Sequence, residues 1–141
     1  LWRPQLVSAE QVEGQRPAEQ RRQLAALATQ WHASLATDGA QAQFVLHDAD
    51  HRGDLMVDAA AIAATLAPDL DFSPQSLALT ISAGELGPAL PLAQLALAHA
   101  QLQRQSEPVL LLGVADNQQR LFGLVDPFPS PTLTAEAPSA P

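Results

Sequence analysis

The chain has 141 residues, of which 47% are hydrophobic, so it is long enough for one core and too short for two. Its net charge is −8 and its 7 basic residues, all arginine, form no patch, so we expect no nucleic-acid partner. The absence of cysteine excludes disulfides, thiolate metal sites and a cysteine nucleophile within this chain. No apolar run reaches the roughly 18 residues of a membrane span.

The first residue is Leu1 and not Met, so we expect a piece of a longer protein from which a signal peptide could have been removed. Residues 1–16 are polar and are expected to form an arm or linker. Residues 17–126 are expected to form a single α/β domain. Residues 127–141 are rich in Pro, Ser, Thr and Ala, which predicts a flexible tail. We expect a cytoplasmic protein, with the periplasm as the alternative if a signal peptide was removed.

The first predicted helix begins at Pro17, whose missing N–H is tolerated in the first turn. It is expected to end at Asp38-Gly39, where glycine suits a left-handed cap. We expect Trp31 to be a core residue and His32 to face solvent. The apolar positions recur at steps of three and four residues, as in an amphipathic helix: Leu24, Leu27, Trp31 and Leu35.

Two strand, loop and helix units are predicted next. The short strand Gln43–His47 leads through the polar loop His47–Asp54 into the Ala-rich helix Val57–Leu66. The strand Leu77–Ile81 leads through the loop Ser82–Gly87 into a second helix. Loops that follow neighbouring parallel strands lie at the same edge of the sheet, where open α/β sheets place their ligands. We therefore expect these two loops to lie close together.

That second helix, Pro88–Arg104, has no charged residue before Arg104 and is apolar around most of its circumference. A helix of this kind is usually buried on most sides. We therefore expect it to be the most buried helix, placed between two layers. We also expect His99 on this helix to be a hydrogen-bonded core histidine.

The strands Pro108–Val114 and Leu121–Val125 are separated by a short polar turn, which predicts a β-hairpin. The predicted elements therefore follow the order α-β-α-β-α-β-β. Alternating helices and strands favour an α/β layered domain with a mostly parallel sheet, which here ends in a C-terminal β-hairpin.

The loop after the first strand is dense in groups that could bind a divalent metal. The weak candidate ligands are His47, Asp50, His51 and Asp54. We favour the alternative, a solvated turn whose carboxylates cap backbone N–H groups, and we expect no metal and no cofactor. Glu85, in the second loop, precedes a helix whose free N–H groups would stabilise a carboxylate.

Two motifs give the chain a resemblance to thiolase-fold proteins, especially the β-ketoacyl synthases. In that family His-Gly-Thr-Gly-Thr is followed by Gly-Asp and an Ala-rich helix. Here His47-Asp48-Ala49-Asp50-His51 is followed by Gly53-Asp54. The family's second motif, Gly-His-Thr, corresponds to Gly84-Glu85-Leu86. The resemblance covers residues 43–125 and implies the C-terminal half of a thiolase-like fold.

The departures from the family pattern imply a degenerate member. The family uses a Cys nucleophile and two His that stabilise negative charge on the substrate oxygen. By resemblance, His47 and Glu85 occupy the two catalytic His positions, and a carboxylate at the second would repel an oxyanion. We therefore expect a non-catalytic binding or assembly module of a bacterial system.

Two alternatives stay open. The chain could be the C-terminal part of an acyl-thioester condensing enzyme whose Cys-bearing half lies on another segment or chain. It could also be a periplasmic α/β protein-interaction domain. From the resemblance we expect a partner: another protein, the missing N-terminal half, or a second copy in a homo-oligomer.

Overall fold

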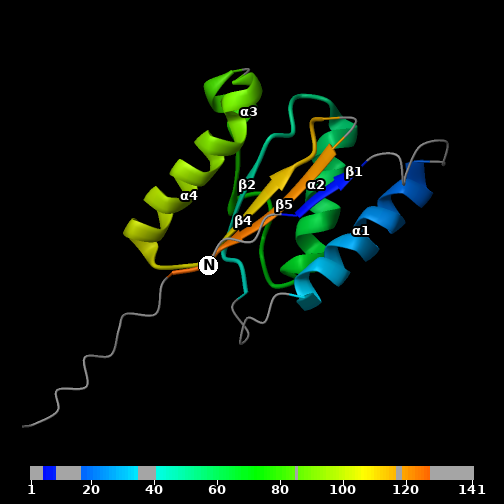
Figure 1. Ribbon diagram of the computed structural model, residues 1–141, viewed down its shortest axis with the longest axis horizontal. Helices are drawn as coiled ribbons and strands as arrows, with labels where there is room; N and C mark the ends of the chain where they lie inside the picture. The colour runs from blue at the N-terminus through cyan, green and yellow to red at the C-terminus, as the bar shows by residue number, and fades with distance from the viewer. Residues whose placement is uncertain (1–4, 9–16, 35–40, 85, 117–118, 128–141) are drawn as a thin grey trace, which may run out of the picture.

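The computed structural model describes residues 5–8, 17–34, 41–84, 86–116 and 119–127. Five strands form one sheet in the order β1-β5-β4-β2-β3 (Figure 1). β2, β3 and β4 are mutually parallel, whereas β5 is antiparallel to both of its neighbours, β1 and β4. The strand bounds are β1 Gln5–Ser8, β2 Phe44–His47, β3 Ser76–Ala78, β4 Val109–Gly113 and β5 Gln119–Val125.

Helices cover both faces of this sheet. α1 and α2 lie on one face and α4 lies on the other, which gives three layers (Figure 1). The short α3 and the 3-10 turn η2 lead from β3 into α4. The helix bounds are α1 Pro17–Ser34, α2 Gly53–Leu66, α3 Leu79–Ala83, η2 Gly87–Ala89 and α4 Leu90–Gln105. None of the helices in the described part of the chain is long and apolar enough to cross a membrane.

The apolar run in β4 is continuous because both of its sides are covered. Val109 and Leu111 pack in the core under α4, whereas Leu110 and Leu112 pack in the core under α1 and α2. Side chains that alternate between two buried faces are typical of a central strand in a covered parallel sheet. The predicted α/β class, the mostly parallel sheet and the C-terminal antiparallel pair are thereby confirmed.

Several predicted element boundaries are wrong. The strand predicted at Leu77–Ile81 ends at Ala78, and α3 takes up the rest. Leu79 is buried in this helical turn, which favours the turn over a longer strand. α2 begins at Gly53, four residues before the predicted start at Val57, so Gly53-Asp54 forms the first turn of the helix and not part of a loop.

A strand also lies inside the segment predicted to be an arm or linker, residues 1–16. Gln5–Ser8 pairs with β5 and forms one edge of the sheet. The expected cap at Gly39 and the Pro-rich tail after Pro127 lie outside the described residues.

The prediction that the helix at Pro88–Arg104, which corresponds to α4, is the most buried helix is wrong. Only Gln94 and Ala98 are buried on α4, whereas Leu92 is 71% exposed and His99 is exposed and not a core residue. α4 packs on the sheet with one side only, so its leucines divide between core and surface. α2 is the more buried helix, with five buried residues. Trp31 is confirmed as a core residue and lies against Phe122.

Candidate functional site

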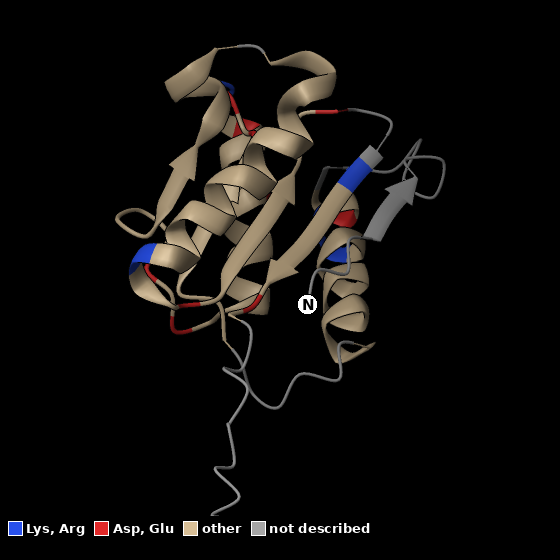
Figure 2. Ribbon diagram, turned by 60° about the vertical axis from the view of Figure 1, so that its left-hand side comes forward, with Lys and Arg blue, Asp and Glu red and all other residues tan. Residues whose placement is uncertain are grey.

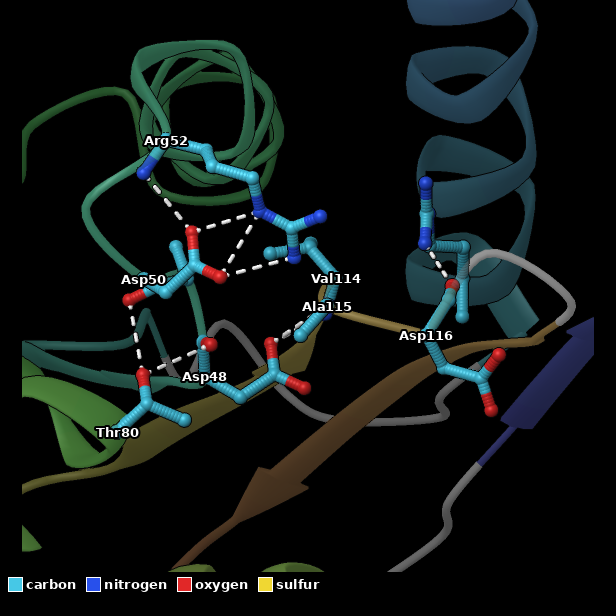
Figure 3. Close-up of polar contacts among 9 residues, drawn as sticks. Asp48, Asp50, Arg52, Thr80, Val114, Ala115 and Asp116 are labelled. Carbon is cyan, nitrogen blue, oxygen red and sulfur yellow. Dashed lines mark hydrogen bonds and ion pairs between the residues drawn. The ribbon is translucent and has the colours of Figure 1, made fainter. Parts of the chain in front are cut away.

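The polar segment after β2 lies at the edge of the sheet where the three parallel strands end. β2 pairs with β3 on one side and with β4 on the other. The residues that follow these strands, Asp48, Thr80 and Val114, meet there (Figure 3). The ends of β2 and β3 lie side by side, but α3 intervenes before the second predicted loop, Ser82–Gly87. The expectation that the two predicted loops lie close together stays a prediction.

Asp48 binds this edge of the sheet together. Its side chain is 5% exposed, and Oδ1 accepts hydrogen bonds from the backbone N–H groups of Val114 at 2.5 Å and Ala115 at 3.0 Å. Its own backbone N–H donates to Leu112 O at 3.2 Å, which extends the ladder between β2 and β4 by one residue. Burial raises the pKa of the Asp48 carboxyl, and the two backbone N–H groups partly offset this effect. The carboxylate is thus a structural group.

Thr80 fastens α3 to the same loop. Its hydroxyl lies 3.0 Å from the carbonyl oxygen of Asp48 and 3.1 Å from that of Ala49, and it donates to them (Figure 3). The contact spans about thirty residues of chain, so it fixes the position of α3 relative to the end of β2. The sequence analysis assigned no role to Thr80.

His47 is part of the core and not of an open site. It is the last residue of β2, is 1% exposed, and stacks on Phe72 with ring centroids 5.3 Å apart. Its Nδ1 atom is buried and has no hydrogen-bond partner among the described residues. Burial lowers the pKa of His47 to about 4, so the imidazole is neutral at pH 7.

The rest of the loop forms a surface turn. Asp50 accepts a hydrogen bond from the backbone N–H of Arg52 at 2.8 Å and pairs with its guanidinium, with Nη2 2.9 Å from Oδ2 (Figure 3). The Arg52 hydrogen bonds lower the pKa of the Asp50 carboxyl. His51 and Asp54 are exposed. Within the described ranges, no three His, Asp or Glu side chains are placed to hold a metal ion.

The second loop has a different character. Ser82 belongs to α3, and Gly84 follows with φ of 77°, a conformation that favours glycine. Glu85 lies outside the described residues, so its assignment to a catalytic position stays a prediction. On α4, the buried Gln94 donates from Nε2 to Leu112 O at 3.2 Å, which explains a polar residue within an apolar helix.

Fold and site together define a three-layer α/β domain whose polar groups at the strand ends bond mainly to one another. No protein-family model matches the chain, and the comparisons with curated proteins and with solved structures found no significant match.

Proposed function

We propose that this chain is a non-catalytic, thiolase/ketosynthase-like module that binds or assembles other proteins of a bacterial system. The observation that carries the proposal is the state of the loop that resembles the family's catalytic loop. His47 and Asp48, the first two residues of that motif, are both buried, and Asp48 accepts a hydrogen bond from the backbone of Val114.

Stabilising an oxyanion requires an N–H group that the substrate oxygen reaches. The imidazole of His47 is 1% exposed and lies against Phe72, so a substrate does not contact it without displacing that ring. Asp48 occupies the position of a family glycine, and its carboxylate binds two backbone N–H groups at the strand ends. The chain also lacks a thiol nucleophile. Each feature favours a structural role for this loop.

A second function is favoured by a different observation. The outer side of α4 exposes large apolar side chains, Leu92 and Leu97. Exposed apolar surface marks interaction sites, and the missing N-terminal half of a thiolase-like fold would cover such a face. The alternative is therefore the C-terminal part of a condensing enzyme whose Cys is supplied by another segment or chain.

Incubation with acyl-thioester donors tests the proposal. We expect the chain to release no thiol and form no condensed product above the rate without protein. The variants His47→Ala and His99→Ala form a matched pair, because His99 lies on the surface of α4. Turnover by the chain that His47→Ala abolishes and His99→Ala preserves would refute the proposal. Turnover that appears only with a Cys-bearing partner protein would favour the alternative.

A further inference from the structure

The chain contains a single Asp-Pro sequence, Asp126-Pro127, and it follows directly on β5. The ladder between β4 and β5 ends at the pair Val109 and Val125, so Asp126 is the first residue beyond the sheet. The segment that begins at Pro127 is the one that the sequence predicts to be a flexible tail. The peptide bond between Asp126 and Pro127 therefore joins the α/β domain to this segment.

The carboxyl group of Asp126 has a buried oxygen without a bound partner. Its Oδ1 atom has no hydrogen-bond partner among the described residues. The two aspartates that follow β2 differ in this respect, because Asp48 accepts two backbone N–H groups and Asp50 pairs with Arg52. Most buried polar atoms in folded proteins are hydrogen-bonded, so this oxygen requires an explanation.

The elements beside Asp126 carry few charges. Among β2, β3, β4 and β5 the one residue of the Asp, Glu, Lys and Arg types is Arg120, near the opposite end of β5, and Figure 2 shows these strands otherwise without charge. Glu107, which precedes β4, is exposed. Burial raises the pKa of the Asp126 carboxyl, and attraction to the N-terminal amino group partly offsets this effect. The carboxyl group therefore keeps its proton to a higher pH than an exposed aspartate does.

We propose that the chain cleaves itself at the Asp126–Pro127 bond in mildly acidic solution and so separates the α/β domain from the segment that begins at Pro127. A carboxyl oxygen of Asp126 attacks the main-chain carbonyl carbon of the same residue and closes a cyclic anhydride. The C–N bond to Pro127 breaks, and the carboxyl proton moves to the proline nitrogen, which leaves as a secondary amine. Water then opens the anhydride, so the cleavage consumes one molecule of water and leaves Asp126 as a C-terminal residue.

The chemistry of this bond favours the reaction for two reasons. The attacking oxygen and the carbonyl carbon belong to one residue, so the reaction is intramolecular and the reacting atoms are already close. The bond to proline is a tertiary amide, whose nitrogen accepts a proton more easily than that of a secondary amide. The reaction occurs once in each chain and involves no acyl thioester, so it is independent of the proposed function.

Mass spectrometry of the full chain tests the proposal. At about pH 5, with circular dichroism showing that the chain is folded, we expect the fragments 1–126 and 127–141 to accumulate. The same chain unfolded in urea is the reference, because its Asp126 has the ordinary pKa of an exposed aspartate. We expect faster cleavage of the folded chain, by about tenfold for each unit by which folding raises the pKa. Equal or slower cleavage of the folded chain would overturn the proposal.

Two variants test the participating groups one at a time. Asp126→Glu keeps the carboxyl but requires a larger ring, and Pro127→Ala replaces the tertiary amide by a secondary one. We expect each to slow cleavage of the folded chain by about tenfold or more, which is about 1.4 kcal/mol in the barrier. Leu92→Ala, on the exposed side of α4, is the matched control and should leave the rate unchanged. Undiminished cleavage in both Asp126→Glu and Pro127→Ala would show that another agent cuts the chain and would overturn the proposal.

Discussion

α2 and α4 cover opposite faces of the sheet, and both are rich in alanine and leucine. α2 buries five side chains, because the sheet lies on one side and α1 packs along another. α4 buries only Gln94 and Ala98, because its main contacts are with the sheet, whereas α2 also packs along α1. Similar compositions thus produce a helix buried in the core and a helix with an apolar outer surface.

The two helices should therefore contribute differently to stability. The core under α1 and α2 includes the larger side chains, among them Trp31 and Phe122, whose ring centroids lie 5.9 Å apart. The side of α4 that faces away from the sheet, which carries Leu92 and Leu97, contributes little burial within the chain. Substitutions in this core should therefore lower the free energy of unfolding more than substitutions on the exposed side of α4.

The largest expected effect comes from the core under α1 and α2. Phe122→Ala removes a fully buried ring, and we expect it to lower the free energy of unfolding by about 3–5 kcal/mol. Leu92→Ala removes a mostly exposed side chain, and we expect a change within about 0.5 kcal/mol. Urea unfolding of dilute protein measures both. Comparable losses for the two variants would mean that α4 is part of the stabilising core.

The pattern of apolar residues in the sequence predicts the central strand of the sheet correctly, but it does not predict how deeply α4 is buried. The run Val109–Leu112 predicts a central strand correctly because only a strand covered on both faces needs apolar residues at successive positions. The apolar run in α4 does not point to one structural arrangement in the same way. A helix with leucines on several sides is equally consistent with burial between layers and with an exposed contact face, and the sequence does not distinguish them.

The second largest expected effect is a loss of folding stability at low pH, caused by the buried His47. Its pKa is about 4 in the folded chain and 6.5 in the unfolded chain, so the unfolded state binds more protons between these values. The contribution of His47 to stability should be constant above pH 6.5 and fall as the pH drops toward 4. A difference of about 2.5 pKa units corresponds to roughly 3 kcal/mol.

The variant His47→Gln isolates this effect. Asp48 acts in the opposite direction, because its raised folded pKa favours the folded state as the pH falls through that value. Comparing the variant with the parent chain at each pH removes the shared contribution of Asp48. We expect the parent to lose more stability than His47→Gln between pH 6.5 and 4. Parallel pH profiles for the two proteins would show that His47 is not buried in the neutral form.

The position of the candidate site in the fold could be predicted from the sequence, but the roles of its side chains could not. Parallel pairing of β2 with β3 and β4 brings their ends together, which the order of elements implies. The sequence does not reveal that Asp48 turns toward Val114, distant in the chain, while its neighbour Asp50 turns toward Arg52. Both are aspartates in one polar loop. Only the three-dimensional structure shows that Asp48 is a buried hydrogen-bond acceptor and Asp50 a member of a surface ion pair.

The smallest of the three effects concerns that buried acceptor. Asp48→Ala leaves the backbone N–H groups of Val114 and Ala115 without their acceptor, and we expect a loss of about 2 kcal/mol. Asp48→Asn retains an oxygen that accepts, so its cost should be smaller. Amide hydrogen exchange gives a local readout, since the amide of Val114 should exchange faster in Asp48→Ala than in Asp48→Asn. Unchanged exchange at Val114 in both variants would show that Asp48 does not hold β2 to β4, and the loop would again be available for another role.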